Sequence, residues 1–254
     1  MKILGEEEQI KIIESRPLKA KNPTIILALP DVGLVGVISA MQMIESLEPR
    51  VIGEIESELF PPITIIHEGK ILAPIRIYEK NGIVIIVSEI PIPTTVIRPL
   101  ISKIVSWAIE KNASLLLIPG GTPSPNRLEI DSPKVFAVAT NDETLKVAKK
   151  HGADTFREGI LVGPHAIALM ESVKKGLNAL SLMAQSFLNY PDPGAAASII
   201  EILNKMLKTN ISVEELLKKA EEIRVRTRDL MRHTSDVMRR MGKMKEYELP
   251  PLYR

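Results

Sequence analysis

Short apolar runs alternate along this chain with segments in which apolar residues recur every three or four positions. Residues 24–29 (TIILAL) form one such run, and residues 32–47 follow with the spacing of a helix. An apolar run of this length, rich in β-branched residues, is typical of a strand buried on both faces. The pattern predicts strands at residues 24–29, 51–57, 71–78, 83–88, 114–118, 135–140 and 179–183. It predicts helices at residues 32–47, 94–111, 142–151, 164–175, 192–210 and 212–245.

Turn and capping residues mark several ends of these elements. Asn81-Gly82 tolerates positive φ at both positions of a two-residue turn, so the strands on either side should form a hairpin. Asp31 is expected to cap the helix that it precedes, because its side chain can accept a hydrogen bond from a free backbone N–H. Ser212 and Glu215 have the spacing of a capping box at the start of the last helix.

Strands that alternate with helices predict an α/β fold with a mainly parallel, mixed sheet that is covered by helices on both faces. A chain of 254 residues is long enough for one large domain of this kind and a small appendage. We therefore expect an α/β core domain at residues 1–211. A C-terminal amphipathic helix at residues 212–246 and an exposed docking tail at residues 247–254 complete the predicted organisation.

The last predicted helix carries apolar and small residues at alternating spacings of four and three, which is the pattern of a heptad seam. The seam consists of Leu216, Ala220, Ile223, Thr227, Leu230, Thr234, Val237, Met241 and Met244. Such a helix either packs on its own domain or protrudes and packs against another subunit. We favour the protruding helix and therefore a homo-oligomer. The expected oligomerisation residues are Leu216, Ile223, Leu230, Val237, Met241 and Met244.

Composition and charge exclude several classes of function. The chain has no cysteine, so it contains no disulfide, zinc–thiolate site or cysteine nucleophile. Its net charge of +2 is too small for a general nucleic-acid binder. No run is long and apolar enough for a signal peptide or a transmembrane helix. We expect a cytoplasmic protein with neither nucleic acid nor membrane as a partner.

The sequence offers few candidates for catalysis. It has no G-x-S-x-G elbow, no P-loop and no H-E-x-x-H motif, and its four histidines are scattered. Residues 31–36 (DVGLVG) open a helix after a strand, where free N–H groups can bind phosphate, although tight packing explains Gly33 and Gly36 more simply. Residues 119–121 (PGG) are expected to form a rigid loop after another strand. We assign no catalytic residue, no metal and no cofactor.

The last helix is strongly basic. Residues 223–245 hold eight Lys and Arg residues against Asp229 and Asp236, which leaves a local charge of +6. This face is either simply solvated or binds an acidic protein surface. It lacks the aromatic side chains that would stack on bases, which argues against nucleic acid.

The C-terminal tail is the most informative segment. Pro250-Pro251 favours a stiff, extended conformation with little entropy to lose on binding. Beyond it stand an apolar side chain, Leu252, a tyrosine, Tyr253, and the terminal carboxylate of Arg254. Leu252 can fill an apolar pocket, Tyr253 adds ring area and a hydroxyl, and the carboxylate can pair with a lysine. The sequence therefore predicts that this tail binds a partner.

The terminus Leu252-Tyr253-Arg254 resembles the hydrophobic–tyrosine–any-residue end of proteasome activators and assembly chaperones. The body of the chain is similar to the archaeal proteasome assembly chaperone family at residues 29–36, 60–62, 119–121 and 189–196. The resemblance implies a fold like that of nucleoside phosphorylases without their catalytic residues, a ring-like homo-oligomer and no cofactor. It also implies that the tail inserts between neighbouring α subunits of the core particle, where the carboxylate meets a pocket lysine.

We therefore interpret the chain as a proteasome assembly chaperone or activator that is not an enzyme. Its expected partner is the proteasome core particle or a ring of α subunits. Because the sequence has no P-loop, this role would be independent of ATP. Two alternatives remain open: an enzyme that acts on a nucleoside-like molecule at residues 31–36 and 119–121, and an adaptor that joins a second chaperone subunit.

Overall fold

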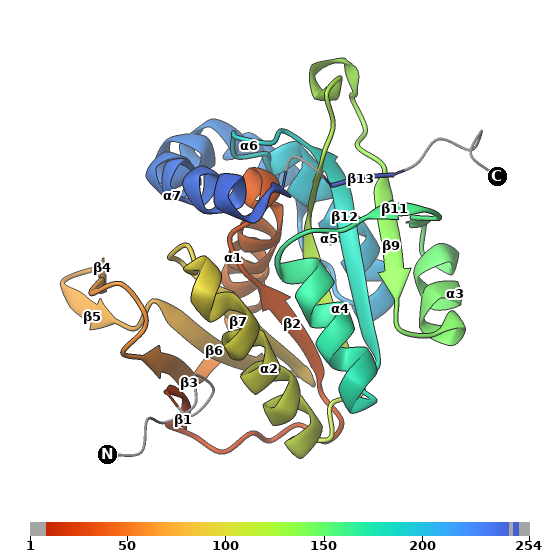
Figure 1. Cartoon of the computed structure of the whole chain (residues 1–254). Helices are drawn as coiled ribbons and strands as arrows, with labels where there is room; N and C mark the ends of the chain where they lie inside the picture. Colours follow the sequence, from red (N-terminus) through yellow and green to blue (C-terminus); the bar gives the residue numbers. More distant parts are fainter. Residues whose placement is uncertain (1–8, 244–245, 249–254) are drawn as a thin grey trace.

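The computed structural model describes residues 9–243 and 246–248, and a mixed nine-stranded sheet crosses the centre of this part of the chain (Figure 1). The sheet consists of β1 (Ile10–Glu14), β2 (Thr24–Ala28), β3 (Arg50–Ser57), β6 (Ile75–Lys80), β7 (Ile83–Ser88), β8 (Leu115–Pro123), β9 (Val135–Ala139), β10 (Asp154–Thr155) and β12 (Ala179–Ser186). The strand order is β1-β3-β6-β7-β2-β8-β12-β9-β10. Two short pairs lie outside it: β4 (Ile65–His67) with β5 (Lys70–Leu72), and β11 (Gly159–Ile160) with β13 (Tyr247–Glu248).

Parallel pairing occupies the middle of the sheet. Strands β7, β2, β8 and β12 run parallel to one another. Antiparallel pairs extend the sheet through β6, β3 and β1 on one side, and β9 pairs antiparallel with β12 on the other. The β6–β7 hairpin turns at Asn81-Gly82, whose φ angles are 50° and 83°. The predicted hairpin and the predicted α/β fold with a mixed sheet are confirmed.

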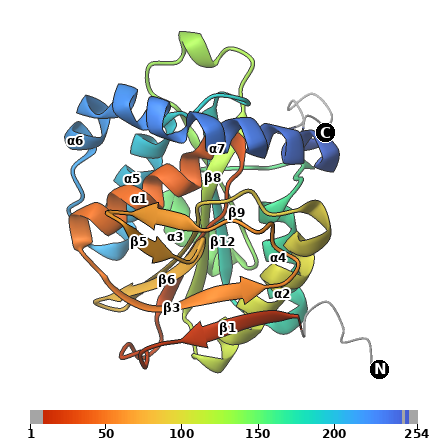
Figure 2. The same cartoon turned by 90° about the vertical axis from the view of Figure 1, so that its left-hand side faces the viewer.

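Helices cover both faces of the sheet, with α1 packed against α5 on one face and α2 against α4 on the other (Figures 1 and 2). Alternating side chains of β2 enter the two cores: Ile26 and Ala28 lie under α1 and α5, whereas Ile25 and Leu27 lie under α2 and α4. All four are buried, as the apolar run predicts. The helices are α1 (Val35–Leu47), α2 (Thr94–Glu110), α3 (Asp142–Lys150), α4 (Pro164–Lys175), α5 (Pro193–Leu207), α6 (Val213–Lys218) and α7 (Ala220–Met241).

Strand β8 is longer than the sequence predicts. Residues 119–121 were expected to form a loop, but they continue the strand. A proline fits there because the pairing of β8 with β2 ends at Leu117, so that its missing N–H interrupts no ladder on that side. The glycines allow close packing rather than a turn: a Cβ on Gly120 would lie 2.2 Å from Nε2 of His165.

Some short elements, at the sheet edge and outside the sheet, were not indicated by the apolar pattern. Residues 71–78 do not form one strand, because Ala73 and Pro74 separate β5 from β6. Strand β1 lies at the edge of the sheet, where of its five residues Ile10 alone is buried. The β4–β5 hairpin leaves Ile66 and Ile71 exposed. These segments bury so few side chains that their sequences show no clear apolar periodicity.

The predicted C-terminal helix is divided in two. Ser212 accepts a hydrogen bond from the backbone N–H of Glu215 at 3.2 Å, so the predicted cap is confirmed. The helix is interrupted at Lys219, which separates α6 from α7. It then ends at Met241 rather than near residue 245, because Gly242 adopts a left-handed conformation with a φ of 73°.

The heptad seam packs on its own domain, and the predicted protrusion of this helix is wrong. Figure 2 shows α7 lying across one end of the molecule, above α1. Leu216 is fully buried, and Ile223, Leu230 and Met241 pack against the cores beneath the helix. Val237 is partly buried. The last of the six expected oligomerisation residues, Met244, lies outside the described residues, and oligomerisation through this seam stays a prediction.

Candidate functional site

The parallel strands end beneath α7, and Asp31 stands at the end of β2. The sequence predicted that Asp31 caps a helix, but its side chain makes no capping bond. A short 3₁₀ turn, Val32–Leu34, intervenes before α1, and Gly33 takes a φ of 59° within it. The carboxylate of Asp31 instead points to Lys243, whose Nζ lies 2.7 Å from Oδ2. The prediction of a cap is therefore wrong, because the 3₁₀ turn separates Asp31 from the first free N–H groups of α1.

Lys243 is fully buried and joins three separate parts of the chain. Its Nζ donates to Oδ2 of Asp31 and to the backbone carbonyl oxygen of Val162, each at 2.7 Å, and lies 2.7 Å from Oε2 of Glu246. An ammonium group has three donors, and here three oxygens are present to accept them. The lysine is therefore satisfied at a position that excludes water.

The segment after α7 returns to the body at this point. Oε2 of Glu246 also accepts a hydrogen bond from the backbone N–H of Val162 at 3.0 Å. Immediately afterwards β13 pairs antiparallel with β11, with Tyr247 opposite Ile160 and Glu248 opposite Gly159 (Figure 1). Lys243, Asp31 and Glu246 form an ion cluster at one end of this attachment, and the β11–β13 pair lies at the other end. Together they hold residues 246–248 against the segment that precedes α4.

A buried histidine forms the floor of the cluster. His165 lies in the first turn of α4, and its Nδ1 is 2.7 Å from Oγ of Ser181 on β12. Its Nε2 is 3.7 Å from Oδ2 of Asp31, which is too long for a hydrogen bond. Burial lowers the pKa of His165 well below its usual value, and the charge of Lys243 lowers it further. His165 is therefore neutral, and its contact with Asp31 is not an ion pair.

Burial and mutual charge set the ionisation of the other members. Burial raises the pKa of Asp31 and of Glu246, although the charge of Lys243 opposes this shift at both carboxyls. Burial disfavours the charged lysine, but the two carboxylates outweigh it and raise the pKa of Lys243. Oδ1 of Asp31 and Oε1 of Glu246 have no hydrogen-bond partner among the described residues. One ammonium group therefore compensates two buried carboxyl groups.

The cluster brings together residue types that a small-molecule enzyme could use. Asp31 follows β2, His165 lies in the first turn of α4 and Ser181 lies within β12, and the fold brings the three together. However, all three are buried, and Lys243 and Glu246 close the space above them. Their polar atoms contact one another and the C-terminal segment. The arrangement is suited to holding that segment in place.

The glycines of residues 31–36 serve packing. A Cβ on Gly33 would lie 2.0 Å from Oγ of Ser186, and one on Gly36 would lie 2.2 Å from the carbonyl oxygen of Pro119. Both contacts are shorter than any real Cβ contact, so only glycine lets the start of α1 approach β8 and β12 this closely. The simpler interpretation of these glycines is therefore supported.

A groove of about 450 Å³ opens beside the cluster, between the loop before α5 and one face of α7. Arg228, Arg232 and Arg239 line it, because spacings of four and seven place them on the same face of the helix. Arg239 also forms an ion pair with Asp236. Six of the eight predicted basic residues are exposed, whereas Lys243 is buried and Lys245 lies outside the described residues. Binding of an acidic partner to this face stays a prediction.

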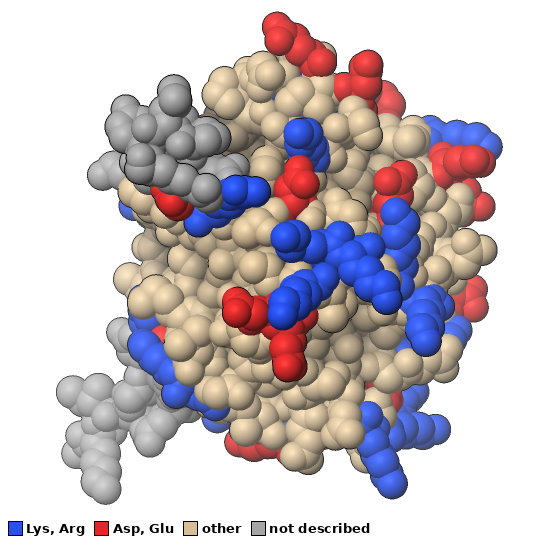
Figure 3. Space-filling model, turned by 90° about the vertical axis from the view of Figure 1, so that its right-hand side faces the viewer, with Lys and Arg blue, Asp and Glu red and all other residues tan. Residues whose placement is uncertain are grey.

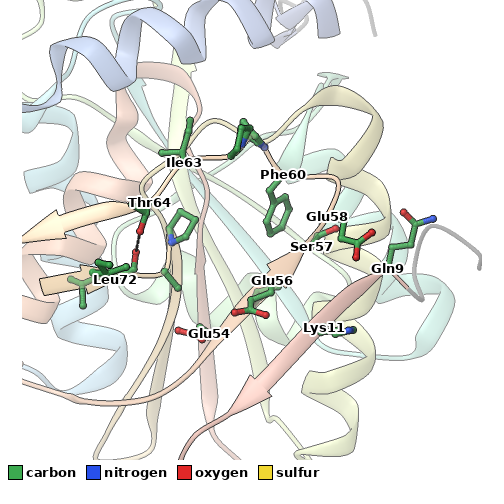
Figure 4. Close-up of a pocket in the computed structure, with 16 residues that line it drawn as sticks. Gln9, Lys11, Glu54, Glu56, Ser57, Glu58, Phe60, Ile63, Thr64 and Leu72 are labelled. Atoms are coloured by element: carbon green, nitrogen blue, oxygen red, sulfur yellow. Dashed lines mark hydrogen bonds between the residues drawn. The ribbon is translucent and has the colours of Figure 1, made fainter.

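Two further surfaces lie away from the cluster. A hollow of about 1020 Å³ lies between the β1–β3 edge and the β4–β5 hairpin, and Figure 4 shows Phe60 among the residues that line it. Figure 3 shows the face that carries α3 and β10, where basic side chains gather. Helix α3 carries Lys146, Lys149 and Lys150, and all three are exposed. In the described part of the chain no helix could cross a membrane, and no group of three acidic or histidine side chains could hold a metal ion.

The docking residues predicted from the sequence are not placed by the structure. Leu252, Tyr253 and Arg254, with Pro250 and Pro251, lie outside the described residues. The residues that sequence reasoning missed are those that hold the segment before them. Lys243 and Glu246 look like ordinary surface residues in the sequence, and no local signal links Lys243 to a carboxylate 212 positions away.

Comparison with known proteins adds a family and a fold. The PAC2 family model matches residues 25–231. An uncharacterized protein of Methanocaldococcus jannaschii is 30% identical over 246 residues, which cover 97% of this chain and 99% of that protein. A second uncharacterized protein of that organism is 26% identical over 223 residues, which cover 83% of each chain.

Solved structures show the same architecture. Pyrococcus furiosus PbaA, described as an archaeal homolog of proteasome-assembly chaperone, aligns with a TM-score of 0.83 and 31% identity, covering 89% of this chain and 98% of that chain. Pyrococcus furiosus PbaB, described as an archaeal proteasome activator, aligns with a TM-score of 0.74 and 21% identity, covering 87% and 98%. At that identity PbaB supports the fold alone. These similarities confirm the resemblance and the α/β fold expected from the sequence.

Proposed function

Because the chain belongs to the PAC2 family, we propose that it acts as a proteasome assembly chaperone or activator. The observation that carries this proposal is the similarity to PbaA, which extends over nearly the whole of both chains. The buried cluster agrees with a binding role, since its polar atoms face one another rather than an open pocket. The absence of a P-loop from the sequence supports a mode of action without ATP.

The C-terminal tail is the proposed docking element. Leu252 would fill an apolar pocket between neighbouring α subunits of the core particle, Tyr253 would add ring contact, and the carboxylate of Arg254 would pair with a lysine. Its support is the sequence of the tail and the attachment of the preceding β13 to the body. Several weak tails on one homo-oligomer would bind a ring far more tightly than one tail does.

The test measures binding of tail variants to purified core particles and to isolated α rings at fixed salt. Tyr253→Ala removes the ring and the hydroxyl, and one residue added after Arg254 moves the carboxylate by about 3.5 Å, beyond hydrogen-bond reach. We expect each change to weaken binding at least tenfold, because the loss is repeated at every tail that engages.

Arg254→Ala is the matched control, because it keeps the terminal carboxylate in place and should weaken binding much less. None of these changes should alter folding or oligomer size, since a chain terminus contributes little to the core. Binding to α rings alone would identify an assembly chaperone, whereas binding to mature core particles would identify an activator. If both altered tails bind as well as the original, the tail is not the docking element.

A further inference from the structure

Lys243 connects the C-terminal segment to parts of the body that lie far away in the sequence. We propose that Lys243 is a positioning residue, which latches residues 246–248 to the body and thereby fixes the point from which the docking tail leaves. This inference rests on the proposed function, because a fixed exit point matters only if the tail binds a partner. Lys243 would act through the tail and would not itself touch the partner.

The latch consists of contacts from three directions. Asp31 lies three residues after β2, and Val162 lies two residues before α4, so both belong to the body of the fold. Glu246 belongs to the C-terminal segment and is bound twice, by Lys243 and by the backbone N–H of Val162. The β11–β13 pair continues the attachment by two residues. The segment is therefore held at its start by the ion pair of Glu246 with Lys243 and at its end by backbone pairing.

The chemistry of the latch argues for positioning rather than for stability alone. An apolar side chain of similar volume would usually hold a buried site as well as an ion cluster does, because buried charges lose their hydration. An ion cluster differs in requiring one geometry. Three oxygens around a single ammonium group accept one register of the segment, and a shift by one residue would leave Lys243 without Glu246.

The length of chain beyond the latch sets the size of the expected effect. Six residues, 249–254, follow Glu248, whereas thirteen residues, 242–254, follow the end of α7. The volume open to the end of a tether grows roughly as the 3/2 power of its residue count, so lengthening the free segment from six to thirteen residues would lower the local concentration of each tail about threefold. The first tail binds from solution and each further tail binds intramolecularly, so binding through two tails should weaken about threefold and binding through three tails about tenfold.

The experiment releases the latch without leaving a charge stranded in the body. Lys243→Met with Asp31→Asn removes one ion of each sign, and Glu246 can reach water with the segment that carries it. Asp31→Asn alone is the matched control, because Lys243 keeps Glu246 and the carbonyl of Val162. We expect the double variant to keep its fold and oligomer size, to lose hydrogen-exchange protection at residues 246–248, and to bind core particles about threefold to tenfold more weakly.

A covalent replacement of the latch supplies the decisive readout. Ile160 and Tyr247 lie opposite each other in the β11–β13 pair, and the chain has no other cysteine to interfere. Ile160→Cys and Tyr247→Cys, added to the double variant, should restore binding when oxidised and lose it again when reduced. A protein that carries the same two cysteines and keeps Lys243 and Asp31 should bind core particles equally in both redox states. This control would show that the cysteines do not themselves weaken binding.

The outcomes separate this inference from the proposed function. If the double variant keeps protection at residues 246–248, Lys243 is not the latch. If it loses protection and still binds like the original, the latch does not position the tail, and the inference is wrong. A bridge that leaves the weakened binding unchanged would also overturn the inference. Removal of residues 252–254 tests the proposed function separately, because it should abolish docking whether the latch is closed or open.

Discussion

Replacing Lys243 with methionine tests the energetics of the buried cluster directly. The change removes the ammonium group that Asp31 and Glu246 share. Glu246 can follow its segment into water, but Asp31 stays in the body and must bind a proton. Protonating a carboxyl at pH 7 costs about 1.4 kcal/mol for each pH unit above its unfolded pKa of about 4, or about 4 kcal/mol in all. We therefore expect Lys243→Met to lower the free energy of unfolding at pH 7 by about 4 kcal/mol, within the range of about 3–5 kcal/mol typical of a broken buried ion pair.

The loss of unfolding free energy caused by Lys243→Met should become smaller at acidic pH. Burial raises the pKa of Asp31 even beside Lys243, and without the lysine this pKa rises further. A carboxyl whose pKa is raised in the folded state loses its stabilising contribution as the pH rises from the unfolded pKa through the folded one. The difference between the original and Lys243→Met should therefore decrease by about 1.4 kcal/mol per unit as the pH falls from 7 toward 5.

Urea unfolding followed by circular dichroism at pH 7 and near pH 5 measures both effects. Lys243→Met with Asp31→Asn is the control, since no carboxyl is then stranded in the body, and its loss at pH 7 should be smaller. A loss below about 1 kcal/mol at pH 7 would show that the cluster is open to water. A loss that stays constant toward pH 5 would show that Asp31 does not bind the compensating proton.

Three further substitutions test the packing around the site by urea unfolding. Gly120→Ala would place a Cβ 2.2 Å from His165, and we expect a loss of about 1–3 kcal/mol from overpacking; an unchanged midpoint would refute the close approach. His165 stays neutral when folded because its pKa is lowered, so the original should lose up to about 1.4 kcal/mol per unit as the pH falls below 6.5, and His165→Gln should lack this slope. Arg127→Met would leave Asp192 buried without the guanidinium that lies 2.7 Å away, which should cost about 3–5 kcal/mol, with partial recovery on adding Asp192→Asn. Equal stability of the single and double variants would contradict that pairing.

Local chemistry was sufficient for much of the fold. The apolar run of β2 predicts a strand buried on both faces, and the two cores on either side of it agree. Asn81-Gly82 specifies its turn through the φ angles that it tolerates, and Ser212 caps its helix through a bond to a residue three positions away. Gly33 and Gly36 also follow from local sequence, as places where a helix start approaches strands closely.

Tertiary structure decided the features that depend on which residues become neighbours in space. An amphipathic seam shows that α7 buries one face, but the same seam fits its own domain or a second subunit, and the position of the cores beneath it determined the outcome. In the sequence Lys243 resembles the other basic residues of a charged helix. Only the fold brings Asp31, 212 positions away, close enough for its Oδ2 to lie 2.7 Å from Nζ of Lys243. Hydrogen bonds between near neighbours leave a signature in the sequence because their partners are fixed by spacing. Burial of a charge leaves none, because its cost and its compensation both depend on groups that only the completed fold assembles.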